Sequence, residues 1–243
     1  MQGIIELRDV AKYYIMGEAI VKAVDGVSIK IGKGEFIAIM GPSGSGKSTA
    51  MNLVGSLDLA TKGAIFLDNV NIEHLEESDL AQIRGQKIGF IFQSFNLIPN
   101  LTAKENITLP MIFQGMNRED REERAESLLK MVELSDRMDH YPNQLSGGQQ
   151  QRVAIARSLA NNPDIILADE PTGNLDTKTG ELVMSFLEDL NKKGKTIIMV
   201  THDPKLAMEH AETIYWLKDG KVEKVTERQG KVWKEKSIVK KRK

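Results

Sequence analysis

Four short segments of the chain are almost entirely apolar, and they predict strands that are buried on both faces. They are FIAIM (36–40), IGFIF (88–92), IILAD (165–169) and TIIMV (196–200). Such runs are typical of parallel strands covered by helices on both sides of a sheet. Apolar and polar residues alternate instead in IIELRDV (4–10) and around Asp25-Gly26, where VKAV and VSIKI predict a hairpin. The pattern indicates an α/β protein with a parallel-sheet core and an N-terminal antiparallel β subdomain.

A helical period appears between the second and third of the buried segments. Within 118–134, apolar residues recur at helical spacing, namely Ala125, Leu128, Leu129 and Val132. Acidic residues near the start of this segment favour a helix N-terminus. We therefore expect an α-helical subdomain, at about residues 94–160, inserted into the α/β core.

Composition narrows the class of protein. Of the 243 residues, 41% are hydrophobic and 28% are charged, which suits a large buried core. The chain has no cysteine, and this excludes disulfides, zinc-thiolate sites and thiol catalysis. The opening MQGIIELRDV does not have the pattern of a secretory signal, and every apolar run is far shorter than the ~18 residues that span a bilayer. Any membrane role should be peripheral.

Charge is distributed unevenly along the chain. The net charge is −1, but from Thr226 onward there are eight Lys/Arg against two Asp/Glu, a surplus of six that leaves −7 for the first 225 residues. This balance argues against nucleic-acid binding by the main body. We expect one domain at 1–225 and a basic C-terminal tail at 226–243. The tail is predicted to be a solvated extension, with weak contact to anionic lipid through Trp233 and Lys240–Lys243 as the alternative.

GPSGSGKST (41–49) matches the phosphate-binding pattern G-x-x-x-x-G-K-[ST]. An apolar strand precedes the loop and STAMNLVG continues it as a helix, so backbone N–H groups and the helix dipole converge on bound phosphate. We expect Lys47 to reach the β- and γ-phosphates and the Ser48 hydroxyl to bind Mg²⁺. Because Pro42 has no N–H, the backbone donors should begin at Gly44. The expected nucleotide contacts are Ser43, Gly44, Ser45, Gly46, Lys47, Ser48 and Thr49.

IILADE (165–170) supplies an acidic partner for that loop. Asp169, at the end of an apolar strand, is expected to hold the magnesium shell. Glu170 is expected to polarise the water that attacks the γ-phosphate. Together with the lysine loop, this pair predicts hydrolysis of a nucleoside triphosphate.

NQLSGGQQQRVAIARSLA (143–160) predicts a second helix N-terminus that suits an anion. Ser146 and Gln149 form a capping-box pattern, which leaves the N–H groups of Gly147 and Gly148 able to approach phosphate. Ordinary helix capping accounts for Ser146 and Gln149. It does not account for two glycines, which weaken a helix unless something must approach closely.

The order P-loop, LSGGQ, IILADE resembles that of the ABC ATPase family, over roughly residues 4–225. The resemblance implies a RecA-like core, ATP and Mg²⁺ as cofactors, and ATP hydrolysis as the activity. It also implies an ATP-dependent homodimer in which two chains pack head to tail. Each LSGGQ signature then closes over the nucleotide on the partner's P-loop through Ser146, Gly147, Gly148 and Gln149.

The same resemblance implies roles for single residues. Gln93, after IGFIF, would sense magnesium and the attacking water, and His202 in VTHDP would contact the γ-phosphate. Tyr14 in KYYIMG would stack on adenine, with Tyr13 as the competing choice, and Asp176 in PTGNLD would contact nucleotide. The expected catalytic residues are Glu170, His202 and Gln93. The expected magnesium ligands are Ser48, Gln93 and Asp169.

PTGNLD and FQSFNLIPNLTAKENITLP (92–110) resemble the branch of the family that serves lipoprotein release and the export of macrolides and peptides. This implies a cytoplasmic ATPase subunit, peripheral on the cell membrane, that drives a separate membrane permease. The alternative is a regulatory ATPase that signals through a permease-like protein without transport.

Overall fold

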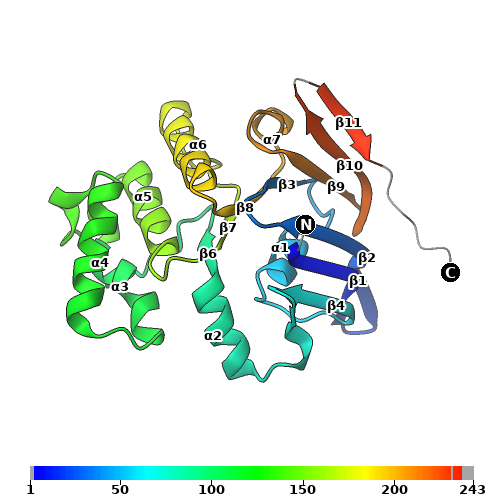
Figure 1. The fold of residues 1–243 in the computed structure, drawn as a ribbon, viewed down its shortest axis with the longest axis horizontal. Coiled ribbons are helices and arrows are strands. Elements are labelled where there is room, and N and C mark those ends of the chain that lie inside the picture. Colours follow the sequence, from blue (N-terminus) through cyan, green and yellow to red (C-terminus); the bar gives the residue numbers. More distant parts are fainter. Residues whose placement is uncertain (1–2, 231, 237–243) are drawn as a thin grey trace. The chain divides into compact units, whose positions relative to one another are not determined.

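The computed structural model describes residues 3–230 and 232–236, and the chain falls into two compact units. The first unit comprises the segment up to Glu76 together with the chain from Thr196 onward, and the second comprises Glu77–Lys195. The blue, orange and red strands of Figure 1 belong to the first unit, and the green helices belong to the second. In the described part of the chain, no helix is long and apolar enough to cross a membrane.

An antiparallel sheet forms one layer of the first unit. Its strands, in the order β2-β1-β4-β5, are β1 (Gly3–Met16), β2 (Ala19–Gly32), β4 (Lys62–Leu67) and β5 (Val70–Asn71). The short helix η1 (Ile72–His74) follows. The turn that joins β1 to β2 contains Gly17, whose φ is 62°, and the flanking residues pair directly across it.

The predicted hairpin turn at Asp25-Gly26 is wrong. This dipeptide lies inside β2, at a place where β1 pairs with the residues on either side but skips the dipeptide. Two residues of β2 therefore face one residue of β1, which is a β-bulge. Gly26 has a left-handed φ of 76°. Glycines adopt this conformation in β-bulges as well as in turns.

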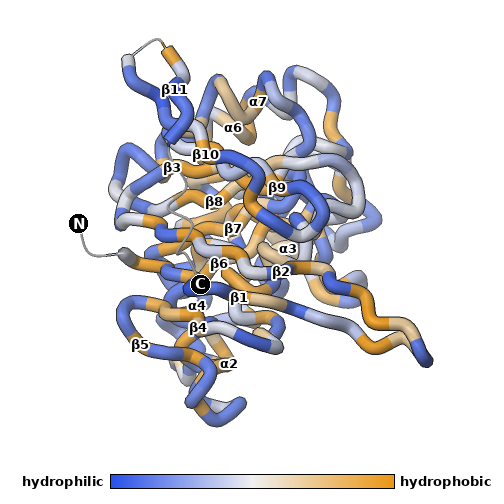
Figure 2. The backbone as a smooth tube through the Cα atoms, turned by 90° about the vertical axis from the view of Figure 1, so that its right-hand side faces the viewer, coloured by the Kyte–Doolittle hydropathy of each residue, from blue (hydrophilic) through white to orange (hydrophobic). Residues whose placement is uncertain are grey.

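Mixed strands form the second layer of the first unit. Their order is β11-β10-β9-β3-β8, comprising β3 (Phe36–Met40), β8 (Thr196–Thr201), β9 (Thr213–Lys218), β10 (Lys221–Gln229) and β11 (Val232–Lys236). The helices of this unit are α1 (Lys47–Val54) and α7 (Pro204–His210). β3 is parallel to β8 and β9, and every residue of β3 and β8 is buried, as their apolar runs predict. Both strands are predominantly orange in Figure 2.

The C-terminal segment differs from the expected solvated extension. β10 continues past Val225, and β11 runs back along it, so that Val225 pairs with Lys236. The guanidinium of Arg228 lies 5.9 Å from the ring centroid of Trp233. This aromatic and cross-strand pairing gives the segment ordered structure. Lys240–Lys243, which carried the expectation of lipid contact, lie outside the described residues.

The second unit contains two parallel strands and most of the helices. Its elements are α2 (Glu77–Lys87), β6 (Ile88–Ile91), α3 (Ala103–Phe113), α4 (Arg118–Met131), η2 (Ser135–Arg137), η3 (Pro142–Gln144), α5 (Gly147–Ser158), β7 (Ile165–Asp169) and α6 (Thr177–Lys192). β6 and β7 are parallel. Helices α3, α4 and α5 pack together within the stretch that we expected to be helical (Figure 1). α4 ends three residues before the predicted limit, because Glu133 adopts a left-handed φ of 58°.

Candidate functional site

The glycine-rich loop at 41–49 connects β3 to α1 in the first unit. α1 begins at Lys47, and its N-cap residue, Gly46, makes no side-chain capping bond. The first turn also lacks an acidic residue. Because the N–H groups of a first turn have no partner within the helix and lie at the positive end of its dipole, this end of α1 suits an anion.

The glycines of the loop serve two different purposes. A Cβ on Gly46 would lie 2.2 Å from the Ala23 carbonyl oxygen, and one on Gly41 would lie 2.2 Å from the Leu217 carbonyl oxygen. These two glycines are therefore required by close backbone packing. A Cβ on Gly44 would meet nothing within 4 Å, although Gly44 has a φ of 76°. The loop thus packs tightly at both ends and faces open space at Gly44.

Lys47 folds back over the loop that it follows. Its Nζ donates to the carbonyl oxygens of Gly41 and Pro42, at 2.8 and 2.9 Å. Both partners are neutral carbonyl oxygens, so neither offsets the positive charge that would attract phosphate. The Ser45 hydroxyl is buried and has no hydrogen-bond partner among the described residues. These features fit a triphosphate cradled by the loop.

A magnesium ion also fits this arrangement. Among the described residues, no cluster of three or more acidic or histidine side chains could hold a metal by itself. Mg²⁺ commonly takes one or two protein ligands and completes its shell with phosphate oxygens and water. Ser48 is exposed at the start of α1 and can supply a hydroxyl ligand.

His202 lies at the same edge of the sheet as the P-loop. β3 and β8 are parallel, and their last residues, Met40 and Thr201, pair with each other. The P-loop follows the first of these residues and the exposed His202 follows the second. Asp203 caps α7 by accepting from the backbone N–H of Lys205 at 2.8 Å. The structure therefore brings His202 to the phosphate-binding edge of the first unit.

The two candidate base-stacking tyrosines have different surroundings. The Tyr14 hydroxyl donates to Asp58 at 2.8 Å, and the Tyr13 hydroxyl donates to Asp25 at 2.6 Å. Burial and Asp58 raise the pKa of Tyr14, whereas the hydroxyl of Thr49, at the end of the P-loop, acts in the opposite sense. Tyr14 is thus the tyrosine that lies on the side of the P-loop helix. This supports Tyr14 over Tyr13 as the residue that stacks on the base.

In the second unit, the structure brings Gln93 beside the segment that follows Asp169. β6 and β7 are parallel, so the residues that follow them leave the sheet at one edge. Glu170 has a left-handed φ of 45°, and its carbonyl accepts from the N–H of Gly173 at 3.0 Å. A Cβ on Gly173 would lie 2.8 Å from the Gln93 side-chain nitrogen. The Gln93 side chain therefore lies against this turn, and a side chain at position 173 would displace its amide.

Asp176 caps α6. Its carboxylate accepts from the backbone N–H of Thr179 at 3.0 Å and from the Thr179 hydroxyl at 2.7 Å. These hydrogen bonds hold the pKa of Asp176 below its usual value. Asp176 therefore has a structural role in α6, and its contact with nucleotide stays a prediction.

The signature segment forms the expected capping box at the start of α5. The Ser146 hydroxyl accepts from the Gln149 N–H at 3.3 Å, and the Gln149 side chain accepts from the Ser146 N–H at 2.8 Å. A Cβ on Gly148 would lie 2.6 Å from Cγ2 of Thr179, so this glycine is needed within the chain itself. Gly147 is exposed, and the nearest neighbour of its Cβ would be 3.8 Å away in Phe95. Close approach by phosphate thus remains a reason for Gly147 alone.

Two polar links between distant residues, one buried and one partly buried, were not predicted from the sequence. Gln151 is fully buried in α5 and donates to the Pro171 carbonyl at 2.7 Å, which ties the signature helix to the segment after Glu170. Lys12 pairs with Asp58 at 2.5 Å across 46 residues of sequence. Such long-range partners have no local sequence signal.

A glycine-rich loop that feeds a helix, with lysine over the loop, defines a P-loop nucleotide-binding protein. The model of the ABC transporter family matches residues 24–173, which is more than half of the chain. The chain is 56% identical over 225 residues to the ABC transporter ATP-binding protein MJ0796 of Methanocaldococcus jannaschii, covering 90% of this chain and 95% of that protein. The chain belongs to the ABC transporter family.

Two further comparisons agree with this assignment. The chain is 47% identical over 219 residues to the macrolide export ATP-binding/permease protein MacB of Hyphomonas neptunium, covering 90% of this chain and 34% of that protein. A solved structure, described as the dimeric post-hydrolysis state of the cassette MJ0796 bound to ADP and Pi, matches with a TM-score of 0.86 at 53% identity, covering 93% of this chain and 99% of that one. The predicted fold class and family are confirmed, and the protein is an ATPase that uses ATP with Mg²⁺.

Proposed function

We propose that this chain is the ATP-hydrolysing subunit of an export or lipoprotein- and peptide-extruding transporter. Two copies pack head to tail, and ATP binding and hydrolysis close and reopen the pair. The exposed N-terminus of α5, with Ser146 and Gly147 at its tip, is the observation that carries this proposal. The dimeric state described for MJ0796 and the export function in the name of MacB support it.

The nucleotide contacts divide by chemistry. Backbone N–H groups of the P-loop and Lys47 bind the phosphates, and Tyr14 stacks on the base. Ser48, Gln93 and Asp169 are the residues that would hold magnesium, which neutralises phosphate charge when bound. Glu170 takes a proton from the attacking water, and His202 donates to the γ-phosphate.

The signature serves the nucleotide of the partner chain. The first turn of α5 lacks an acidic residue, so its dipole and N–H groups favour an anion. Gly148 already packs against Thr179 of its own chain, whereas Ser146 and Gly147 face outward. The outward groups are available to a phosphate that a second copy brings.

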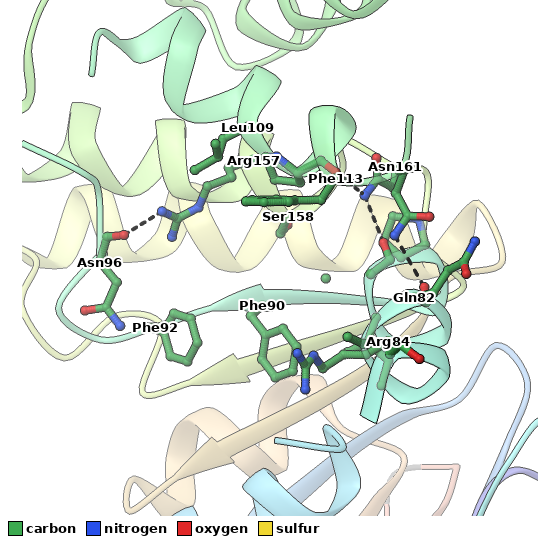
Figure 3. A pocket seen from close by; sticks show the side chains of 18 residues that line it. Gln82, Arg84, Phe90, Phe92, Asn96, Leu109, Phe113, Arg157, Ser158 and Asn161 are labelled. Carbon is green, nitrogen blue, oxygen red and sulfur yellow. Dashed lines mark hydrogen bonds between the residues drawn. The ribbon is translucent and has the colours of Figure 1, made fainter. Parts of the chain in front are cut away.

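A cavity in the second unit supplies a place for the permease. Its volume is about 760 Å³, and its apolar wall contains Phe90, Phe92, Leu109, Pro110 and Phe113 (Figure 3). The first two rings stack with their centroids 5.6 Å apart. Phe113 is 79% exposed. An apolar wall that ends in a large exposed aromatic residue is typical of a surface that a partner covers.

The charge of the cavity indicates what it receives. Arg84 and Arg157 line it, whereas no Asp or Glu is among the described residues around it. Arg157 donates to the backbone carbonyls of Asn96 and Phe95, at 2.5 and 2.8 Å, and pairs with no carboxylate of the described chain. Burial lowers the pKa of Arg157. A cytoplasmic permease segment with an apolar face and a carboxylate would complete this site.

Co-expression with a candidate permease, identified as a membrane protein that co-purifies with this chain, tests the proposal. Phe113→Ser should leave the ATPase rate of the isolated subunit unchanged but abolish its stimulation by the permease in proteoliposomes. Leu182→Ser, which alters another exposed apolar residue of the same unit but outside the cavity, is the matched control and should preserve stimulation. Stimulation that survives Phe113→Ser would contradict docking at the cavity. Stimulation without movement of any substrate would favour the regulatory alternative.

A further inference from the structure

Two side chains of β1 meet a carboxylate that follows the P-loop helix more than forty residues later in the chain. The Asp58 carboxylate accepts from Nζ of Lys12 at 2.5 Å and from the hydroxyl of Tyr14 at 2.8 Å. Nζ of Lys12 also donates to the Leu59 carbonyl at 2.9 Å and lies 5.2 Å from the Tyr14 ring centroid. One carboxylate therefore holds a lysine and a tyrosine that are two residues apart on β1.

Asp58 is itself fixed to α1. The helix ends at Val54, and the backbone N–H groups of Leu57 and Asp58 donate to the carbonyl of Asn52, at 2.8 and 3.3 Å. α1 begins in the P-loop, so a continuous path of contacts runs from the phosphate-binding turn through α1 to Asp58. From there it passes to Tyr14.

Tyr14 needs such an anchor because of its position in the hairpin. It lies two residues before the end of β1, and the neighbouring Ile15 and Met16 are 80% and 67% exposed. Figure 2 shows the projecting β1–β2 hairpin, with orange, hydrophobic stretches just before its blue tip. Tyr14 is itself 36% exposed. Without a link to α1, its ring could sample several orientations relative to the phosphates.

We propose that Asp58 is a positioning residue for nucleotide binding: by binding Lys12 and the Tyr14 hydroxyl together, it holds the Tyr14 ring ready to stack on adenine. The proposal rests on the assignment of Tyr14 as the base-stacking residue. The ammonium of Lys12 lies against the ring, so the base stacks on the opposite face.

The protonation of the cluster agrees with this geometry. Burial alone would raise the pKa of Asp58, but the hydrogen bonds from Lys12 and Tyr14 outweigh it, and the pKa is lowered. Asp58 is therefore ionised at neutral pH and accepts from both partners. Fixing a side chain before a ligand arrives removes part of the ordering cost of binding, about 0.5–1.5 kcal/mol for one such side chain. At 1.36 kcal/mol per tenfold, loss of Asp58 should weaken ATP binding about two- to tenfold.

Asp58→Ala tests the proposal, with Asp25→Ala as its matched control. Tyr13 is next to Tyr14 on β1, and its hydroxyl donates to Asp25 of β2, so the control removes an equivalent bond. We expect Asp58→Ala to raise the KM for ATP about two- to tenfold at nearly constant kcat, and Asp25→Ala to leave both unchanged. Magnesium tripolyphosphate, which has no base, should inhibit wild type and Asp58→Ala with the same Ki. Tyr14→Phe, which keeps the ring but lacks the hydroxyl, should raise KM and add little to Asp58→Ala.

Each other outcome has a distinct meaning. An unchanged KM in Asp58→Ala overturns the proposal. A KM and a tripolyphosphate Ki that rise together also overturn it, because they show that the P-loop helix itself has moved. If Asp58→Ala does not fold, Asp58→Asn, which still accepts from Tyr14 but loses the charge facing Lys12, is measured in the same way. An unchanged KM in Tyr14→Ala refutes the base-stacking assignment, whereas a raised KM there with no effect of Asp58→Ala refutes the positioning role alone.

Discussion

Gly44 and Gly46 both have a left-handed φ, yet replacing each with alanine should have very different costs. The values of φ are 76° and 94°. For a residue with a side chain, this region costs about 1–2 kcal/mol. Alanine also reduces the conformational entropy of the unfolded chain, and this stabilises the folded state by about 0.4–1 kcal/mol. Because a Cβ on Gly44 would meet nothing within 4 Å, we expect Gly44→Ala to lower the free energy of unfolding by about 0–1.6 kcal/mol, the difference between these two effects.

Gly46→Ala carries an additional steric cost. Its Cβ would lie 2.2 Å from the carbonyl oxygen of Ala23, which is backbone and cannot rotate away. Shifting β2 or the start of α1 to relieve such overpacking costs typically about 1–3 kcal/mol. The total loss should therefore be about 3 kcal/mol.

Urea unfolding without nucleotide measures the difference. The two tryptophans, Trp216 and Trp233, both belong to the first unit, so their fluorescence reports on the unit that carries the P-loop. Equal midpoints for the two variants would refute the account of why Gly46 is a glycine.

Three further changes have defined outcomes. Glu170→Gln should lower the ATPase rate by ~10²-fold or more while ATP still binds, and near-wild-type turnover would exclude its role as the base. Burial raises the pKa of Tyr215 from 10.0 to about 12, so the neutral hydroxyl stabilises the fold below pH 10, and that stability is lost as pH rises toward 12. Tyr215→Phe, but not the exposed Tyr141→Phe, should remove this alkaline loss of about 2–3 kcal/mol in urea titrations at pH 9 and 12. Gly148→Ala should destabilise the protein because the new methyl group would collide with Cγ2 of Thr179. Thr179→Ser removes that methyl group, so it should restore stability in the double variant. A double variant that unfolds at the same temperature as Gly148→Ala would contradict the contact.

The buried strands could be predicted because their environment leaves a continuous mark on the sequence. FIAIM and IILAD became β3 and β7 with the predicted limits, since both faces of each strand demand apolar residues. The capping box at Ser146 was equally local, because three residues specify it. In both cases the physical requirement lies within a few consecutive residues, so it is visible in the sequence.

Features that depend on contacts between residues far apart in the sequence could not be predicted in this way. Asp25-Gly26 has the composition of a turn, but the same left-handed glycine serves a bulge inside β2. From the sequence, we explained the glycine at position 148 by the close approach of phosphate. In the structure, a side chain at Gly148 would instead collide with Thr179 on another helix. The link between Lys12 and Asp58 depends on how β1 packs beside the end of α1, which pattern alone does not encode.

Mixing two inactive variants tests most directly whether each nucleotide is shared between two chains. Lys47→Ala removes the charge that binds phosphate, and Ser146→Arg blocks the signature, so each homodimer should be inactive. In a head-to-tail heterodimer, one site carries both lesions and the other carries neither, so ATPase activity should return with a maximum near equal mixing. Heterodimer formation is verified independently by two different affinity tags. If proven heterodimers stay inactive, and cysteines placed at Ser43 and at the exposed Gly147 fail to crosslink between chains with ATP, the shared site is contradicted.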